Sequence, residues 1–185
     1  MRLFVALDIQ QRLDDYVRTL QPRLPGVRFV RSSNYHVTLK FLGELLASEA
    51  VRECLRELRH PGFQIDISGV GFFPNTHAPR VFWAGINAPL LSGLAHSVDT
   101  TIRALGFPLE CEFHPHLTLA RNGSGRPRPL RGERSPDAFA QLAEIVASSV
   151  APEFGTMTAH EFFLFESILS PRGATYRKVR RYPLT

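Results

Sequence analysis

The chain has 185 residues, of which 44% are hydrophobic and 21% charged, and its formal net charge is +5. This length allows one domain, or two lobes that share a core, to bury roughly 70% of the unfolded surface without disulfides or metals. No apolar run approaches the ~20 residues of a membrane span, and Cys54 and Cys111 form no CxxC pair, so we expect a cytoplasmic protein with reduced thiols and no membrane association.

The first half of the chain predicts strands alternating with amphipathic helices. Ser48 is the expected N-cap of the second helix, Leu105 belongs to the apolar stripe of the third, and Gly106 is its stop. The predicted strands cover residues 2–8, 34–43, 63–67, 69–75 and 80–86. The predicted helices cover residues 11–24, 48–60 and 89–107.

The second half predicts a similar order of elements. A strand over 114–121 leads into a Gly/Pro/Arg loop over 122–135 and a helix over 136–150, with Ser135 as N-cap and Pro136 at its first position. Two strands, over 158–170 and 174–184, form a closing antiparallel hairpin. Long helices mixed with hairpins favour the α+β class over a regular parallel sheet.

Two of the predicted strands carry the same short motif, His-x-Thr-Leu, which begins at His36 and again at His116. On a strand, residues i and i+2 point to the same face. His36 therefore projects with Thr38, and His116 with Thr118, while the aliphatic residues between them point to the core. If the two polar faces meet across a cleft, two imidazoles and two hydroxyls converge on a small volume.

Cleavage of a phosphodiester requires one group that accepts a proton and one that donates it, and histidine can do either near neutral pH. Threonine hydroxyls can donate hydrogen bonds to the non-bridging oxygens, and Arg121 can stabilise the developing charge. Arg121 lies five residues after His116, on the opposite face of a regular strand. It can reach the site only from the strand end or after a bulge.

These histidines also allow a structural role or a metal site. A single His-x-Thr is most often structural, whereas a matched pair favours a site. His114 and His116 have the HxH spacing of metal ligands, with His77, His96 and His160 as further donors, but no acidic residue accompanies either motif at ligand spacing, so we expect no metal. His60, His77, His96 and His160 are expected on the surface or in packing, and His114 as a supporting residue.

Nearly all of the 22 basic residues are arginines, and they fall in two clusters. Arginine suits phosphate because its planar fork donates paired hydrogen bonds, so the clusters and the pI near 9.8 indicate an anionic partner. Solvated surface in a chain from a GC-rich genome explains them equally well. The clusters are Arg121, Arg126, Arg128, Arg131 and Arg134, and Arg177, Lys178, Arg180 and Arg181.

The pair "NYHVTLKFLGE" and "FHPHLTLAR", with "MRLFVALD", "GFFPN", "RVFWAGI" and "YRKVRRYPL", resembles the LigT-like RNA 2',3'-cyclic phosphodiesterases, formerly called 2'-5' RNA ligases, of the two-histidine (2H) phosphoesterase superfamily. The resemblance implies one LigT-like domain over residues 1–185. It implies a bilobal α+β fold with two pseudo-symmetric antiparallel sheets, flanked by helices, and a central cleft.

The implied activity is metal-independent, cofactor-free hydrolysis of RNA 2',3'-cyclic phosphate ends, tRNA fragments among them, to 2'-phosphomonoesters by a monomer. The reverse reaction is an ATP-independent 2'-5' RNA ligation. His36 and His116 match the catalytic positions, Thr38, Thr118 and Arg121 match phosphate-binding positions, and Phe41 and Phe4 match positions that contact the base. We assign His116 as general base and His36 as general acid, an order that the sequence does not decide.

Two alternative functions remain open on the sequence. One is a phosphodiesterase of the same superfamily that acts on a cyclic nucleotide metabolite, such as ADP-ribose 1'',2''-cyclic phosphate. The other is a non-catalytic RNA-binding protein. The loop over 122–135 is longer and more basic than the resemblance predicts, so it gives no indication of how RNA beyond the terminal nucleotide is held.

Overall fold

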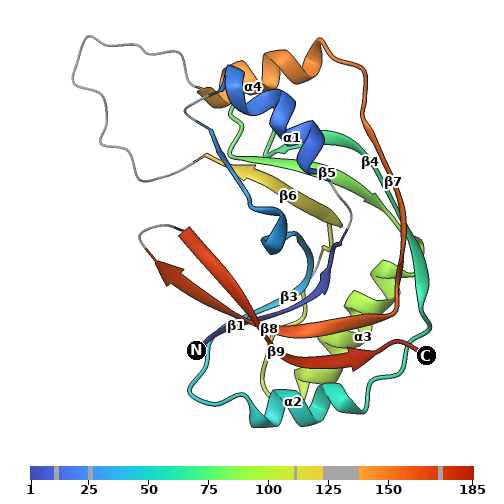
Figure 1. The fold of residues 1–185 in the computed structure, drawn as a ribbon. Coiled ribbons are helices and arrows are strands. Elements are labelled where there is room, and N and C mark those ends of the chain that lie inside the picture. The colour runs from blue at the N-terminus through green and yellow to red at the C-terminus, as the bar shows by residue number, and fades with distance from the viewer. Residues whose placement is uncertain (11–12, 25–26, 111, 123–137, 171–172) are drawn as a thin grey trace.

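The strands form two antiparallel sheets that lie across from each other, with helices on their outer sides (Figure 1). This computed structural model describes residues 1–10, 13–24, 27–110, 112–122, 138–170 and 173–185. The four-stranded sheet has the order β3 (His36–Glu44), β1 (Arg2–Asp8), β8 (Glu161–Ser170) and β9 (Gly173–Pro183). The five-stranded sheet has the order β2 (Arg28–Phe29), β6 (His116–Arg121), β5 (Val81–Asn87), β4 (Phe63–Phe73) and β7 (Glu153–Ala159). The expected α+β class is confirmed.

The helices cover the outer face of each sheet (Figure 1). Helices α1 (Asp14–Leu20) and α4 (Ala138–Ala147) pack on the five-stranded sheet, where Tyr16 contacts Phe154 and Phe139 contacts Phe72. Helices α2 (Glu49–Arg56) and α3 (Leu91–Arg103) lie outside the four-stranded sheet. The concave sides of the two sheets are thereby left to face each other.

Strand β1 shows why the four-stranded sheet is buried on both faces. Leu3, Val5 and Leu7 point into the main core beneath the helices. Phe4 and Ala6 alternate to the other face, where they form a separate cluster with aromatic residues of β8. An apolar run without polar interruption is what such a strand requires.

Two segments of the chain fold differently from the prediction. The strands expected over 63–67 and 69–75 are one strand, β4, because the register shifts at Gly69 and the left-handed φ of +68° at that residue absorbs the irregularity. The strand expected over 158–170 is broken at His160. The residues before His160 belong to β7 in the five-stranded sheet and those after it to β8 in the four-stranded sheet, so the chain changes sheets there.

The helices are shorter than their apolar periodicity predicts. Helix α1 gives way to a 3₁₀ turn (Gln21–Arg23) that contains a proline near its start, and α3 ends before Leu105, which is 36% exposed instead of buried. Gly106 follows with a φ of +88°, consistent with the expected stop. Ser48 occupies the N-cap position of α2, but its hydroxyl makes no capping hydrogen bond.

Some predictions fall outside the described residues: Ser135, Pro136, Cys111 and the basic loop after Asn122. Within the described part of the chain, Cys54 is a free thiol. None of the described helices is long and apolar enough to cross a membrane.

Candidate active site

The two His-x-Thr motifs lie on strands of different sheets. His36 and Thr38 begin β3, and His116 and Thr118 begin β6. All four side chains are half-buried, whereas the alternate residues, among them Val37 and Leu117, are fully buried. The predicted assignment of the two faces of each strand is confirmed.

Both motif strands are irregular at the same position. In β3, Thr38 pairs with Ala6 but Lys40 pairs with the neighbouring Val5, which leaves Leu39 as an extra residue. This is a β-bulge, in which two residues on one strand oppose one on its partner. The bulge reverses the alternation of faces, so that Phe41 returns to the side of His36 and is exposed.

In β6 the same irregularity follows Thr118, because Thr118 pairs with Trp83 and Ala120 pairs with the adjacent Phe82. Leu119 and Ala120 are consequently both buried, and Arg121 emerges as an exposed side chain. Its Nη2 lies 3.4 Å from Oγ1 of Thr118 and donates a hydrogen bond to it. The bulge therefore explains how Arg121 reaches the side of the histidine despite its odd spacing.

The two imidazoles are held in the same way. Nδ1 of His36 lies 2.7 Å from the backbone oxygen of Asn34, and Nδ1 of His116 lies 2.7 Å from the backbone oxygen of His114. A carbonyl oxygen only accepts, so Nδ1 must carry a proton in both rings. Nε2 is therefore the atom available for proton transfer in each, with a lone pair when the ring is neutral.

The pKa of each histidine lies below its ordinary value, so both rings take up a proton less readily than a free imidazole. Burial lowers the pKa of His36, and the charges of Arg121 and His116 lower it further, against the opposing effects of the Asn34 carbonyl and Asp8. Burial is also the largest effect that lowers the pKa of His116, followed by Arg121 and His114, with the His114 carbonyl opposing. Because Arg121 acts on both rings, and His116 acts on His36, the two motifs share one electrostatic environment across the sheets.

A pocket of about 280 Å³ opens between the two motif strands. Thr38 and Phe41 of β3 and His116 of β6 line it, and Phe41 is 63% exposed. His36, Thr118 and Arg121 are not among its lining residues. The full lining is Thr38, Leu39, Phe41, Phe73, Glu110, Glu112, Phe113, His114 and His116.

Phe4 does not line this pocket, and the position expected for it beside a base does not fit the structure. Its ring is only 3% exposed, stacks on Phe165 at 5.2 Å and lies 4.9 Å from the His36 ring. It therefore packs beneath the histidine and supports it.

Three residues that the sequence did not indicate contact the histidines. The ring of Tyr176 meets His36 edge-on at 4.9 Å, and Phe73 meets His116 in the same manner at 5.0 Å. Asn34, whose backbone orients His36, also donates from its side chain to the backbone of Ala174 in the β8–β9 hairpin. The contact of Tyr176 with His36 and that of the Asn34 side chain with Ala174 join segments far apart in the sequence, for which local spacing carries no signal.

His114, which lies two residues before the second motif, has an acidic neighbour, contrary to the expectation that no acidic residue accompanies the motifs. Its Nε2 lies 3.1 Å from Oε2 of Glu112, and both side chains are exposed. Among the described residues, however, no group of three histidine, cysteine or acidic side chains is arranged to hold a metal ion. His77, His96 and His160 are exposed on the surface, and His60 packs against Phe63.

The basic cluster of β9 is largely neutralised within the four-stranded sheet. Arg177 pairs with Glu166 at 2.5 Å, Lys178 with Asp8 at 2.5 Å, and Arg181 with Glu161 at 3.1 Å. Lys178 also lies over the ring of Phe163. These cations are less available to an anionic partner than their sequence clustering indicates.

Comparison with known proteins agrees with this geometry. The model of the family described as LigT like phosphoesterase matches residues 3–83 and 86–176. The chain belongs to the LigT-like phosphoesterase family. The family expected from the two motifs is thus confirmed, and this LigT-like protein is an enzyme of the phosphoesterase class.

Relatives and solved structures cover nearly the whole LigT-like chain. It is 36% identical to the RNA 2',3'-cyclic phosphodiesterase of Archaeoglobus fulgidus, over 97% of this chain and 98% of the relative. The enzyme of the same name from Methanothermobacter thermautotrophicus is 33% identical over 100% and 99%. The crystal structure of Escherichia coli LigT complexed with 3'-AMP matches with a TM-score of 0.72 and 26% identity, over 100% and 98% of the two chains. The crystal structure of Escherichia coli LigT complexed with phosphate matches with a TM-score of 0.69 and 26% identity, over 100% of this chain and 97% of that one.

Proposed function

We propose that this protein hydrolyses RNA 2',3'-cyclic phosphate ends to 2'-phosphomonoesters by metal-independent acid-base catalysis. The observation that carries the proposal is the matched pair of imidazoles, one from each sheet, each with Nδ1 bound to a backbone carbonyl and Nε2 free to transfer a proton. The names of the relatives, RNA 2',3'-cyclic phosphodiesterase, support the choice of substrate.

In the proposed reaction, Nε2 of His116 accepts a proton from a water molecule as its oxygen attacks the phosphorus. The bond between phosphorus and the 3' oxygen breaks, and the His36 imidazolium donates its proton to that oxygen. The phosphate stays on the 2' oxygen, and one water is consumed. Each positioned acid or base contributes roughly 10²- to 10⁴-fold to the rate.

The threonines and Arg121 stabilise the phosphate in this scheme. Thr38 and Thr118 lie two residues after the histidines, on the same strand face, where their hydroxyls can donate to non-bridging oxygens. The charge of Arg121 acts on both histidines, so its guanidinium is close enough to stabilise the negative charge that accumulates on the phosphate in the transition state. Phe41, exposed at the rim of the pocket, provides a face on which a base can stack.

The same groups can open the cyclic phosphate with an alcohol in place of water, which gives the 2'-5' ligation. A 5'-hydroxyl takes the place of water, His116 accepts its proton, and the 3' oxygen again leaves with the proton from His36. The product is a 2'-5' linkage, and no ATP is consumed because the strained cyclic phosphate already carries the energy.

A single incubation tests the proposal. An oligonucleotide with a 2',3'-cyclic phosphate end is treated with the protein in EDTA, and the end-group is identified by mass and by comparison with authentic 2'- and 3'-phosphate standards. The proposal predicts a gain of one water and a 2'-phosphate. A 3'-phosphate product, or activity that disappears in EDTA and returns with zinc, would overturn it.

A further inference from the structure

The two motif strands differ in the residue that the bulge buries. In β6 it is Ala120, an uncharged residue that needs no partner, but in β3 it is Lys40, whose side chain is only 2% exposed. Removal of an ammonium group from water costs several kcal/mol unless acceptors replace the water. The otherwise matched strands therefore depart from symmetry at a residue whose burial is expensive.

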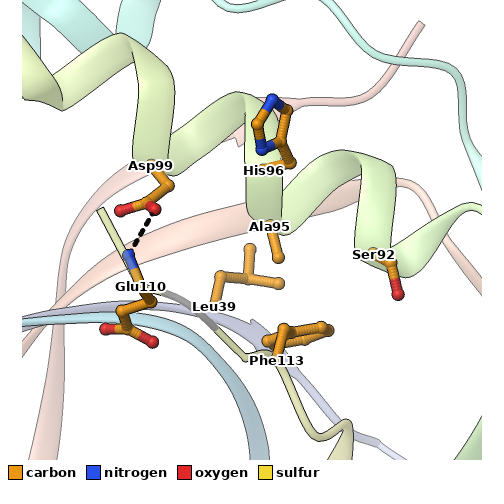
Figure 2. Close-up of a pocket in the computed structure, with 7 residues that line it drawn as sticks. All are labelled: Leu39, Ser92, Ala95, His96, Asp99, Glu110 and Phe113. Carbon is orange, nitrogen blue, oxygen red and sulfur yellow. Dashed lines mark hydrogen bonds between the residues drawn. The ribbon is translucent and has the colours of Figure 1, made fainter.

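Lys40 meets three acceptors beneath the strand. Nζ lies 2.6 Å from Oδ1 of Asp99 on α3, 3.4 Å from Oε1 of Glu110, and donates to the backbone oxygen of Pro108 at 2.6 Å. The contact with Pro108 is a hydrogen bond, and the two contacts with carboxylates are ion pairs. The second carboxylate oxygen of Asp99 accepts from the backbone N–H of Glu110 at 2.8 Å, as Figure 2 shows. One network thus joins the motif strand, a helix and the segment that leads to the other motif.

That segment forms one wall of the proposed substrate pocket. Glu110, Glu112 and Phe113 face the same space as Thr38 and His116. Behind the wall lies a second pocket of about 170 Å³ (Figure 2). Glu110 and Phe113 line both pockets, and Asp99 lines the second. Phe113 packs against the main core, whereas Glu110 lies between the two pockets and is 44% exposed, so polar contacts contribute to its position. The ion pair and hydrogen bonds of Lys40 and Asp99 hold it at its distance from β3.

We propose that Lys40 is a positioning residue for substrate binding, which acts through Asp99 and Pro108 on the pocket wall and does not touch the substrate. The substrate named here rests on the proposed function. The wall shares the pocket with Phe41, the proposed stacking face for the base, whereas Thr118 and Arg121, which are proposed to hold the phosphate, are not among the lining residues. Loss of the network should therefore weaken binding of a nucleotide but leave binding of phosphate alone unchanged.

The alternative is that Lys40 only stabilises the fold, and the kinetic constants distinguish the two roles. A purely structural loss reduces the amount of folded enzyme, which lowers the apparent kcat and leaves KM unchanged. A displaced wall raises KM in the molecules that remain folded. In K40M, we expect KM for a nucleoside 2',3'-cyclic phosphate to rise about 10-fold or more, with kcat per folded molecule within about threefold of wild type.

A second variant removes the stability problem that K40M creates. K40M leaves the Asp99 carboxylate buried without its cation, whereas K40M/D99L removes both charges, a change that is often neutral or stabilising. We expect the double variant to recover thermal stability and still show the raised KM. Inorganic phosphate, used as a competitive inhibitor, should keep its wild-type inhibition constant in both variants. L55A, which removes a buried side chain of α2, is the matched control that lowers stability with KM unchanged.

A wild-type KM in the folded double variant would overturn the proposal, as would an inhibition constant for phosphate that rises in parallel with KM. The proposed function fails separately, because its failure is the absence of wild-type turnover of the cyclic phosphate. In that event the positions are compared by the binding of 3'-AMP and of inorganic phosphate to wild type and K40M/D99L. Weaker binding of the nucleotide alone supports the positioning role, and equal binding of both overturns it.

Discussion

Replacement of Arg121 by glutamine removes a cation that acts on both histidines. Arg121 donates to Thr118, and its charge lowers the pKa of His36 and of His116. A hydrogen bond to a charged group contributes about 1.5–3 kcal/mol, so the loss of one such bond to the phosphate predicts a fall in kcat/KM of about 10- to 150-fold.

The same variant should change the pH dependence in a defined direction. Without the guanidinium, nothing in that position repels a proton from either ring, so the pKa of both histidines rises. The optimum of kcat/KM should move to higher pH. R121K, which keeps the charge but not the planar fork, should lose activity with an optimum close to that of wild type.

The assay is the initial rate of hydrolysis of a nucleoside 2',3'-cyclic phosphate across the pH range for wild type, R121Q and R121K. R103Q removes an exposed arginine from α3 and serves as the control for net charge, with no expected change in rate or optimum. An R121Q enzyme with kcat/KM within twofold of wild type and an unmoved optimum would refute the role of the bulge in delivering Arg121.

Three further predictions concern titration, the base and the basic cluster. Because the pKa of each histidine lies below its ordinary value of 6.5, the singly protonated pair is most populated below pH 6.5, and kcat/KM should peak there. A bound phosphate anion raises both pKa values, so kcat should peak at higher pH than kcat/KM; the reverse order contradicts the scheme. F41A should raise KM by about 5- to 100-fold through lost stacking, with kcat nearly unchanged, and a control substitution of the fully exposed Leu46 should not. R177Q/R181Q should leave the salt dependence of oligonucleotide binding almost unaltered, because both arginines are paired with glutamates; a shallower dependence by about two phosphate contacts would show that these pairs open on RNA.

The parts of the site that follow from strand periodicity could be predicted from the sequence. The spacing of His36 and Thr38, with Val37 between them, assigned the polar and core faces correctly because period-two alternation is a local property. The family also followed from the two motifs taken together. Each motif alone would not have sufficed.

The parts that depend on pairing between strands could not be predicted. The bulges at Leu39 and Leu119 are set by register against β1 and β5, and nothing in the motif itself signals them. The resemblance implied that Phe4 contacts the base, but its neighbours on β8 and β9, which local sequence does not reveal, bury it. The burial of Lys40 could not be predicted either, because its acceptors, Asp99 of α3 and the backbone of Pro108, come from distant segments.

The missed boundary at His160 has a comparable cause. Residues 158–170 contain a long apolar run and no glycine or proline, so the sequence predicts one strand. The break is imposed by the tertiary structure, in which the backbone oxygen of His160 accepts a hydrogen bond from Leu184 at the end of the chain. One residue then suffices to pass the chain from one sheet to the other.

The most direct test of the two-histidine scheme is the turnover of a 2',3'-cyclic phosphate by H36N and H116N in the presence of EDTA. Asparagine retains a donor near the position of Nδ1 but cannot exchange a proton as Nε2 does, so the fold should persist while catalysis is lost. H160N, at an exposed histidine outside the site, is the matched control. The scheme predicts that each site variant loses at least about 10²-fold in kcat at unchanged thermal stability, with H160N unaffected. Near wild-type turnover in either H36N or H116N would contradict it.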